Sequence, residues 1–506
     1  MSETSIPNLL SHLPSGQGTV AIHNPTNGKK IYELPQLSAE DVAAAVANAR
    51  TAQKDWQDSS PASRAAILLR THDLLMENQD RLIDLLQLET GKAKSHAFEE
   101  VAGAYGAARY FGKISAKALK PKRTKAGVPV LTKTWIEHVP LGVVGVITPW
   151  NYPLALTMLD VLPALAAGNT VVQKADNQTA LTVLFARHLA IEAGLPESAW
   201  TVVVGNGAEV GNAITDNADY VAFTGSTATG RMVAERAAKR LIGYSLELGG
   251  KNPMIVLEGA NLKRAADLAL AGAFGSAGQL CVSLERVYVP NHLKDAFAIE
   301  IAERAEKLTV GYSKNFDMDM GTLAGQAQID RVSGFVDQAV DSGAKVVSGG
   351  HALPELGPYF YAPTVLTDVT AAADLYRKEV FGPLLDLEGY DSISEAIDLA
   401  NDTEYGLNAA VVGPKREAMR VASKLMAGSV NINEGFRATF ASMESPMGGM
   451  KNSGKGRRNG VEGLLRFTET RTVGIASGLL RLPLRAKDYN QMAPLMVLLM
   501  KVLRRF

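Results

Sequence analysis

Residues 143–173 read VVGVITPWNYPLALTMLDVLPALAAGNTVVQ, in which two short apolar runs, Val143–Ile147 and Thr170–Gln173, flank a longer helical segment. Short apolar runs that alternate with helical segments predict parallel strands in a sheet covered by helices. The alternation continues in a first series of strand candidates at Thr201–Val204, Tyr220–Phe223, Ser245–Leu248 and Pro253–Leu257. A second series covers Arg286–Val289, Lys345–Ser348, Thr364–Thr367, Leu384–Leu387, Ala409–Val412 and Val430–Ile432. The two series predict an α/β fold with two parallel-sheet domains, and a cleft between such domains is where small molecules usually bind.

The first third of the chain is predicted to be mainly helical. Ser60 followed by Pro61 is typical of a helix start, and the run from Arg64 to Leu88 has apolar residues at helical spacing. A basic, proline-containing stretch at Lys117–Lys125 leads into Val128–Val139, which is expected to form an extended arm.

Composition argues against several classes of protein. The chain has 506 residues, enough for two or three domains, and its 52 Lys and Arg balance its 52 Asp and Glu, which argues against nucleic acid as a partner. A single cysteine rules out an intrachain disulfide and a multi-cysteine metal site, and the eight histidines form no HExxH motif, so no metal is expected. No signal peptide and no apolar run of membrane-spanning length are evident, so a cytoplasmic location is expected.

The C-terminal segment 481–506 is basic. Its apolar stretch Leu495–Met500 is too short to span a bilayer. Asp488 is the one acid in the segment, and the basic residues are Arg481, Arg485, Lys487, Lys501, Arg504 and Arg505. A helix that packs on this subunit or on a neighbour is the first interpretation, and a helix that lies on a membrane surface is the second.

Cys281, the only cysteine, follows Gly278-Gln279-Leu280 between a helix-like run and a strand-like run. A lone cysteine is usually an inert, buried, small apolar residue. Here the glycine predicts a turn, and a thiol on a turn can be reached by substrate and activated as a thiolate.

Two polar residues fall at the ends of predicted buried strands. Glu247 precedes Gly249-Gly250-Lys251, and burial is expected to raise the pKa of its carboxyl toward neutrality, as a general base requires. Asn151, in Pro149-Trp150-Asn151-Tyr152-Pro153, could donate its amide to an oxyanion, although a plain turn residue is the more common role.

Three further segments could contact a nucleotide. The stretch Phe223-Thr224-Gly225-Ser226-Thr227-Ala228-Thr229-Gly230 predicts a strand-to-helix turn whose backbone N–H groups could bind a phosphate, with a plain tight turn as an equal alternative. Lys174 follows a strand and could contact ribose or phosphate, or could simply be solvated. Glu379, in Glu379-Val380-Phe381-Gly382-Pro383, is by itself typical of a turn before a strand.

Taken together, these segments resemble the aldehyde dehydrogenase superfamily over about residues 24–473. The resemblance rests on motifs in the family's order, which are Glu89-Thr90-Gly91-Lys92, Pro149-Trp150-Asn151, Phe223-Thr224-Gly225-Ser226-Thr227, Leu246-Glu247-Leu248-Gly249-Gly250-Lys251, Gly278-Gln279-Leu280-Cys281 and Glu379-Val380-Phe381-Gly382-Pro383. It implies a homodimer or homotetramer whose subunit has a modified Rossmann cofactor-binding domain (1–120 and 141–248), a catalytic domain (249–450), a small β oligomerisation arm (121–140 and 451–480) and a basic tail (481–506).

The resemblance also implies a mechanism and a cofactor site. Cys281 as a thiolate attacks the aldehyde carbon, and the Asn151 amide and the Cys281 backbone N–H hold the oxyanion. Hydride leaves the thiohemiacetal for the nicotinamide, and Glu247 activates the water that hydrolyses the resulting thioester. By the same resemblance the cofactor is held by Lys174 at the adenosine ribose, Ser226 at the pyrophosphate and Glu379 at the nicotinamide ribose, with Trp150, Asn151, Asn177, Gly225, Leu248 and Phe381 around them.

Asn177 bears on the choice of cofactor. Many NAD-preferring members have Lys-Pro-x-Glu where this chain has Lys174-Ala175-Asp176-Asn177. That glutamate repels a 2′-phosphate, and one like-charge pair at about 4 Å costs about 4 kcal/mol at an effective dielectric constant of about 20. Asn177 removes the repulsion and can donate a hydrogen bond, so NADP is the expected cofactor and NAD is a possible one, although Asp176 could supply a replacement charge.

Within the family the chain looks most like bacterial NADP-type succinate-semialdehyde dehydrogenases, so oxidation of succinate semialdehyde is the first expectation. Several members of that group bind the substrate carboxylate through arginines where this chain has Leu159 and Gly275, and Arg437 is the candidate replacement. A broad-specificity or aromatic aldehyde dehydrogenase is the alternative, and a catalytically inert structural homologue is a third interpretation. Ser283 stands where redox-switched relatives have a second cysteine, so no disulfide switch is expected.

Overall fold

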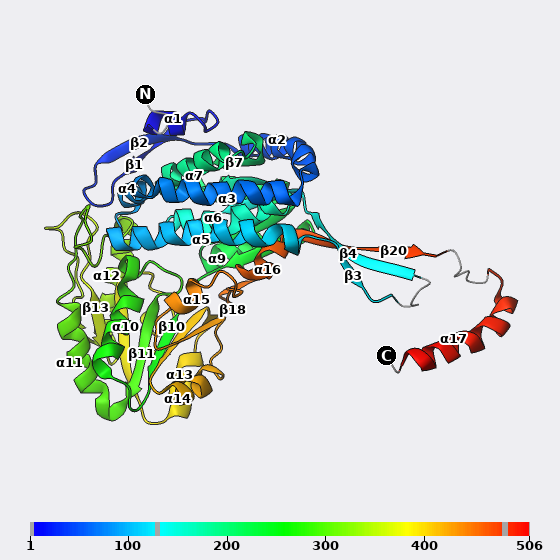
Figure 1. Ribbon diagram of the computed structural model, residues 1–506. Helices are drawn as coiled ribbons and strands as arrows, with labels where there is room; N and C mark the ends of the chain where they lie inside the picture. The colour runs from blue at the N-terminus through cyan, green and yellow to red at the C-terminus, as the bar shows by residue number, and fades with distance from the viewer. Residues whose placement is uncertain (1–4, 127–131, 478–483, 505–506) are drawn as a thin grey trace. The chain divides into compact units, whose positions relative to one another are not determined.

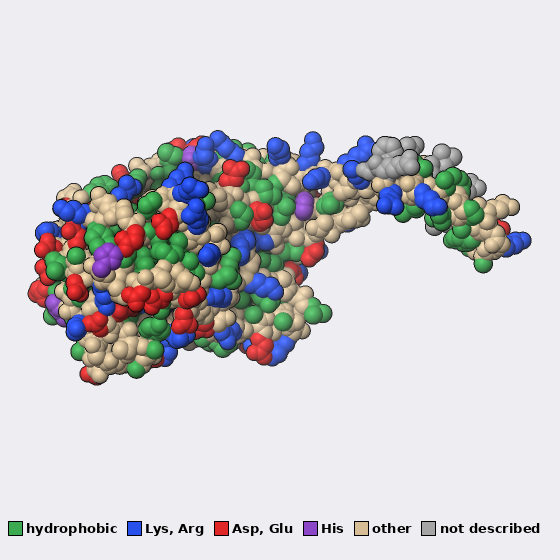
Figure 2. Space-filling model, turned by 90° about the horizontal axis from the view of Figure 1, so that it is seen from below, with side chains coloured by type: hydrophobic (Ala, Val, Ile, Leu, Met, Phe, Trp, Pro, Cys, Tyr) green, Lys and Arg blue, Asp and Glu red, His purple; other side chains and the backbone are tan. Residues whose placement is uncertain are grey.

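The computed structural model describes residues 5–126, 132–477 and 484–504. The chain divides into a larger unit, residues 1–118 and 140–468, and a smaller unit, residues 119–139 and 469–506. In the larger unit, helices cover two separate sheets (Figure 1). Acidic and basic side chains are interspersed on the face of this unit that Figure 2 shows, as the balanced charge predicts.

The first sheet has six strands in the order β19-β9-β8-β5-β6-β7. Its parallel strands are β5 (Val143–Ile147), β6 (Thr170–Lys174), β7 (Trp200–Val203), β8 (Tyr220–Thr224) and β9 (Gly243–Glu247), and β19 (Gly454–Lys455) is antiparallel to β9. They are connected in turn by α6 (Pro153–Ala166), α7 (Ala180–Glu192), α8 (Gly207–Asn217) and α9 (Thr227–Lys239). All residues of β5, β6 and β8 are buried, which explains their continuous apolar runs.

The second sheet has seven strands in the order β12-β13-β14-β11-β10-β16-β17. Its strands are β10 (Asn252–Val256), β11 (Leu284–Pro290), β12 (Lys345–Ser348), β13 (Thr364–Thr367), β14 (Leu384–Tyr390), β16 (Asn408–Val412) and β17 (Ser429–Ile432), and only β12 is antiparallel to its neighbour. Its helices are α10 (Leu262–Phe274), α11 (Lys294–Ala305), α12 (Gln326–Asp341), α13 (Ile393–Asn401), α14 (Lys415–Ala422) and α15 (Arg437–Phe440). Two mainly parallel sheets confirm the predicted α/β class.

The helical first third also forms as predicted, with one break. Its elements are α1 (Ile6–Leu10), β1 (Thr19–His23), β2 (Lys30–Pro35), α2 (Ala39–Asp58), α3 (Pro61–Glu77), α4 (Gln79–Thr90) and α5 (Lys94–Ala118). Ser60 caps α3 by accepting a hydrogen bond from the Ser63 N–H. The run predicted from Arg64 to Leu88 is two helices, because Asn78 ends α3 and begins α4.

The smaller unit contains a three-stranded sheet in the order β20-β4-β3 and the helix α17. Their bounds are β3 (Lys122–Thr124), β4 (Thr132–Pro140), β20 (Thr468–Ala476) and α17 (Tyr489–Leu503). The arm predicted from the sequence included 451–480, but 451–468 belongs to the larger unit, because β19 pairs with β9 and α16 (Gly460–Leu465) packs on α5 and α6. The larger unit also contains two short strands, β15 (Tyr405–Gly406) and β18 (Met450–Lys451), which pair with each other. The part of the predicted extended stretch at 128–131 lies outside the described residues.

Candidate active site

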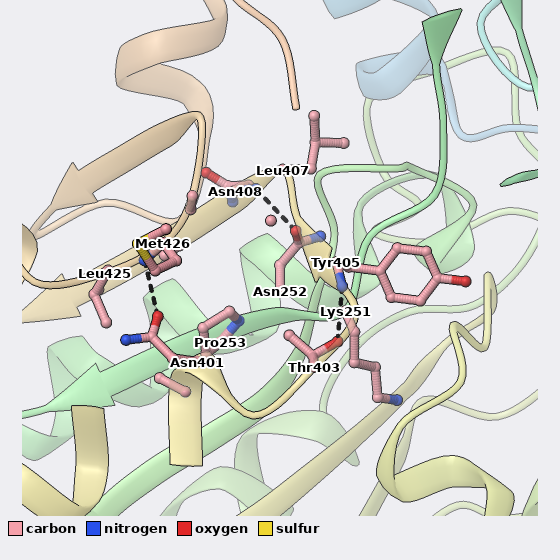
Figure 3. A pocket seen from close by; sticks show the side chains of 14 residues that line it. Lys251, Asn252, Pro253, Asn401, Thr403, Tyr405, Leu407, Asn408, Leu425 and Met426 are labelled. Atoms are coloured by element: carbon pink, nitrogen blue, oxygen red, sulfur yellow. Dashed lines mark hydrogen bonds between the residues drawn. The ribbon is translucent and has the colours of Figure 1, made fainter. Parts of the chain in front are cut away.

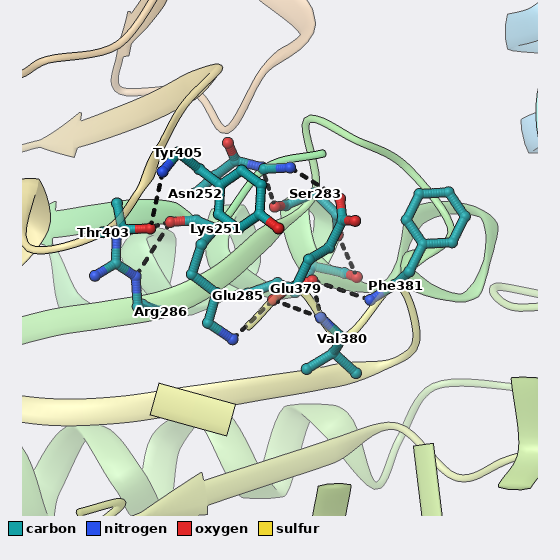
Figure 4. Close-up of polar contacts among 12 residues, drawn as sticks. Lys251, Asn252, Ser283, Glu285, Arg286, Glu379, Val380, Phe381, Thr403 and Tyr405 are labelled. Carbon is teal, nitrogen blue, oxygen red and sulfur yellow. Dashed lines mark hydrogen bonds and ion pairs between the residues drawn. The ribbon is translucent and has the colours of Figure 1, made fainter. Parts of the chain in front are cut away.

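Cys281 follows a turn with unusual backbone geometry between α10 and β11. Ser276, Ala277 and Gly278 have φ angles of 49°, 54° and 69°, in the left-handed region that side chains disfavour. A Cβ on Gly278 would overlap the carbonyl oxygen of Gly382, so only glycine fits there. Asn252, at the start of β10, donates from Nδ2 to the Cys281 carbonyl at 2.8 Å and so fixes the far side of the turn (Figure 4).

The thiol shares a cavity of about 240 Å³ with residues from the carboxyl ends of β5, β8 and β9 and from the loop before β14. The predicted site residues that line it are Trp150, Asn151, Gly225, Ser226, Glu247, Leu248, Cys281, Glu379 and Phe381. Strand order explains the assembly, because β9, β8 and β5 are neighbours and parallel, so their carboxyl ends meet at one edge. Three other predicted residues, Lys174, Asn177 and Arg437, do not line this cavity.

Glu247 is a buried carboxyl at the end of β9. Its side chain is 4% exposed, and its Oε1 has no hydrogen-bond partner among the described residues. Burial raises the pKa of this carboxyl to about 7, against the attraction of the Arg458 and Arg466 guanidinium groups. A carboxyl with a pKa near neutrality can accept a proton and release it again at neutral pH.

The Cys281 thiol has a raised pKa. Burial raises its pKa to about 12, and the negative charges of Glu247 and Glu379 act in the same direction. The thiol is therefore protonated at neutral pH in this structure, and it needs a base in order to attack a carbonyl carbon.

Asn151 links the turn after β5 to the turn that carries Cys281. Its Nδ2 donates to the Gln279 carbonyl in the cysteine turn at 2.8 Å, and the second amide N–H remains for a substrate oxygen. The Asn151 carbonyl accepts from Lys92 Nζ at 2.8 Å. Lys92 is paired in turn with Glu100, whose carboxylate also accepts from the Leu154 N–H at 2.7 Å. The buried Lys92–Glu100 ion pair thus fixes the turn that presents Asn151.

Several cavity residues have chemistry that fits a dinucleotide. Ser226 caps α9, so the N-terminus of this helix and a hydroxyl lie at the cavity wall. Glu379 accepts from the Gly250 N–H at 2.9 Å, which leaves its second oxygen for a ribose hydroxyl. Phe381, with φ of 58°, meets the Trp150 ring edge-on at 5.6 Å between centroids.

Lys174 and Asn177 lie at and just after the carboxyl end of β6, the neighbour of β5. Lys174 is 6% exposed, and its Nζ donates to the Ala175 carbonyl at 3.2 Å. The Asn177 side chain already makes two hydrogen bonds, since Oδ1 accepts from the Gly205 N–H at 3.0 Å and Nδ2 donates to Gln36 Oε1 at 3.4 Å. Asp176 accepts from the Gln178 N–H at 3.0 Å.

Arg437 lines a second cavity, of about 280 Å³, whose other walls are mainly apolar. They include Phe98, Tyr152, Leu280, Phe436, Phe440 and Met443. Leu280 and Tyr152 are also neighbours of Cys281 and Asn151 in the sequence and pack in one apolar cluster with Cys281. The Arg437 guanidinium is bound to the Glu99 carboxylate, with Nε to Oε1 at 3.1 Å. A further hollow beside Asn252 and Asn408 has about 10 Å³, room for one water at most (Figure 3).

Comparison with known proteins identifies the family. The sequence profile described as the aldehyde dehydrogenase family matches residues 12–473. The chain belongs to the aldehyde dehydrogenase family. Among its relatives is a Mycolicibacterium smegmatis protein named "Putative succinate-semialdehyde dehydrogenase (NADP+)", 49% identical over 88% of this chain and 86% of the relative. A Mycobacterium tuberculosis protein named "Putative succinate-semialdehyde dehydrogenase (NADP+) 2" is 46% identical over 89% of this chain and 87% of the relative.

Solved structures of the family agree with the fold. An E. coli structure described as an NADP-dependent enzyme has a TM-score of 0.87 at 35% identity, covering 90% of this chain and 95% of its own. Betaine aldehyde dehydrogenase from Staphylococcus aureus, in complex with NAD+, has a TM-score of 0.89 at 32% identity, covering 94% of this chain and 97% of its own.

Sequence reasoning missed the buried ion pairs that support this aldehyde dehydrogenase site. Lys251 Nζ lies 2.8 Å from Glu285, whose carboxylate accepts from the Val380 N–H at 3.0 Å and so holds the loop that presents Glu379 (Figure 4). Arg458 donates from Nε to Asp160 at 2.9 Å and also donates to Thr224, at the end of β8. Asp160 is a carboxylate within the mainly apolar helix α6, and from this feature of the sequence the Asp160–Arg458 pair could have been predicted.

Proposed function

We propose that this chain oxidises an aldehyde to the carboxylic acid with NADP as the hydride acceptor, and that Cys281, Glu247 and Asn151 carry the reaction. The observation that carries the proposal is the 240 Å³ cavity, in which the only thiol and a carboxyl with a pKa of about 7 share the walls with an asparagine amide. The six-stranded sheet would then form the cofactor-binding domain and the seven-stranded sheet the catalytic domain.

In the proposed mechanism, the thiol proton leaves to solvent water as Cys281 Sγ attacks the aldehyde carbon, and Glu247 stays unprotonated for the later hydrolysis. The second Asn151 amide N–H and the Cys281 backbone N–H donate to the oxygen as it gains negative charge. The adduct becomes a Cys281 thioester by losing the hydride of the aldehyde carbon, and NADP, when bound, would supply the acceptor for that hydride. Glu247 next accepts a proton from the water that attacks the Cys281 thioester, and the proton returns to Sγ as the acid leaves. A pKa near neutrality suits both proton transfers.

The preference for NADP is supported by Asn177 and by the names of the relatives. Asn177 carries no charge that would repel a 2′-phosphate, and the relatives cited above are named for NADP. The Asn177 Nδ2 donates to Gln36 Oε1 at 3.4 Å, a long hydrogen bond, so a phosphate oxygen can replace Gln36 at this amide while Oδ1 keeps its bond to the Gly205 N–H. Initial rates with NADP and NAD test this directly, and equal kcat/KM values for the two cofactors would refute it.

For the aldehyde itself, succinate semialdehyde is the first candidate, supported by the relatives' names. The cavity around Arg437 supports a second candidate, an apolar or aromatic aldehyde, because its walls are mainly hydrophobic and Arg437 is already paired with Glu99. A substrate carboxylate would have to take the place of Glu99 on Arg437.

Matched variants separate the two candidates. With succinate semialdehyde as substrate, Arg437→Gln should raise KM at least about tenfold and Glu99→Gln should lower it, because the first removes the cation and the second releases it. Rates with hexanal and benzaldehyde should be unchanged in both variants. If Arg437→Gln leaves the KM for succinate semialdehyde unchanged, Arg437 does not bind the substrate, and a kcat/KM that is higher for hexanal would favour the second candidate.

We further propose a cytoplasmic homodimer or homotetramer assembled through the arm. In support, β20 is nine residues long and lies at the edge of the sheet β20-β4-β3. Within the described part of the chain its second edge has no strand partner, and an exposed strand edge readily pairs with another chain. Light scattering after size-exclusion chromatography tests this, and a monomer would refute it.

A further inference from the structure

Helix α17 exposes an unusual amount of apolar surface. It belongs to the smaller unit and lies beyond residue 473, where the match to the family profile ends. Every residue from Leu495 to Met500 is apolar, and each is between 39% and 65% exposed. A contiguous exposed patch of this kind usually marks a surface that contacts something else.

The apolar side chains of α17 are arranged in a stripe. Met492, Leu495, Met496, Leu499 and Met500 recur at spacings of three and four and therefore share one side of the helix. Asn490 and Lys501 fall on the opposite side. Val497 and Leu498 lie outside the stripe, so the middle of the helix is apolar on every side and its polar side chains are confined to its two ends.

Positive charge surrounds this stripe. Arg485 and Lys487 precede the helix, and Lys501 and Arg504 lie at its end. Asp488 is the one acid in the sequence 481–506, which holds six Lys and Arg in total and so has a net charge of +5. Two copies of the segment would repel each other, whereas an anionic surface would attract it.

The length of α17 decides how it can meet a bilayer. At 15 residues it is about 22 Å long, shorter than the hydrocarbon core of about 30 Å. In agreement, no helix in the described ranges meets the length and hydropathy needed to cross a membrane. An apolar helix that is too short to cross and has basic residues at both ends can lie in the plane of the interface, with its apolar side chains among the acyl chains and its basic residues at the headgroups.

We propose that α17 is a surface anchor that docks this enzyme on lipid bilayers with anionic headgroups. The apolar stripe supplies the hydrophobic contact and the flanking Arg and Lys residues supply the electrostatic one. Stable peripheral binding generally needs two such signals together. No described residue of α17 is among those that line the Cys281 cavity, and the proposal does not depend on which aldehyde is oxidised.

The test is co-sedimentation of the full-length protein with vesicles of phosphatidylcholine alone and of phosphatidylcholine with one third phosphatidylglycerol. We expect binding to the anionic vesicles at least about tenfold tighter than to the neutral ones, weakening as salt is added. Equal binding to both vesicles, or binding to neither, would overturn the proposal.

Two matched variants test the orientation of the helix. Leu499→Gln lies in the stripe and Leu498→Gln lies on the other side, so the first should weaken binding about tenfold or more and the second much less. Equal effects of the two would contradict the proposed orientation. Loss of oligomers in Leu499→Gln without any vesicle binding by the wild type would show that a second copy covers the stripe instead. Aldehyde oxidation in solution should be unchanged in both variants, which controls for folding.

Discussion

The raised pKa of Glu247 predicts that one substitution will increase stability while it removes activity. Burial raises this pKa from 4.5 to about 7. At 1.36 kcal/mol per pKa unit, the charged carboxylate costs the folded state about 3 kcal/mol. Glu247→Gln removes this charge and nearly keeps the volume. Gln buries an uncharged amide at every pH, so it shifts the free energy of unfolding by an amount that does not depend on pH. The informative quantity is therefore how the stability difference between the variant and the wild type changes with pH.

The sign of the pH dependence follows from proton linkage. The folded wild type binds the Glu247 proton more tightly than the unfolded chain does, so its advantage is complete below pH 4.5 and is lost as pH rises through about 7. The stability of Glu247→Gln relative to the wild type should therefore increase by about 3 kcal/mol from acidic pH to pH 8. Urea unfolding at several pH values measures it. A difference that does not change with pH would refute the raised pKa.

The same variant tests the role of Glu247 as a base. The steady-state rate should fall about 10²–10⁴-fold, the usual contribution of a general base. Glu379→Gln is the control, since burial also raises the pKa of Glu379 to about 7. It should show a similar pH-dependent gain in stability but act mainly on the KM for the cofactor. An unchanged kcat in Glu247→Gln would refute its catalytic role.

Three further predictions use other contacts. Asn177→Glu should lower the kcat/KM ratio of NADP to NAD at least about tenfold, because the new carboxylate repels the 2′-phosphate, and initial rates with both cofactors measure it. Lys251→Met should destabilise the fold by about 3–5 kcal/mol in urea unfolding, because it leaves the buried Glu285 without its partner; a smaller loss would mean that the pair is not needed. Alkylation of Cys281 by iodoacetamide should still accelerate above pH 9 and should become faster in Glu247→Gln, because the carboxylate raises the thiol pKa; a plateau near pH 8 would contradict this.

Most of the fold follows from the sequence because buried parallel strands leave continuous apolar runs. Every predicted strand is present and begins within two residues of its expected start. Assignment to a sheet is less local: β10 is the last strand of the first series along the chain, but it pairs with β11 and β16 in the second sheet, in line with the catalytic domain that the resemblance places at 249–450. The short strand β19 pairs with β9 across some two hundred residues, which no pattern around Gly454 reveals.

The site could be predicted where motifs are contiguous but not where distant charges meet. Trp150, Asn151 and Ser226 follow strands of the six-stranded sheet at one edge, Cys281 and Glu379 precede the strands β11 and β14 of the seven-stranded sheet, and all five line one cavity. The raised pKa of Cys281 could not be predicted from the sequence, since it depends on burial and on carboxylates from other segments. The pairing of Arg437 with Glu99, 338 positions away, could not be predicted from the sequence either.

The most direct test of the account is the intact mass of Glu247→Gln after it is mixed with NADP and an aldehyde. We expect an added mass equal to the acyl group, released by hydroxylamine and located on Cys281, which as the only cysteine makes the assignment unambiguous. Cys281→Ala should show neither the added mass nor reduction of NADP. Absence of the acyl mass in Glu247→Gln, or sustained aldehyde oxidation by Cys281→Ala, would contradict catalysis through a cysteine thioester.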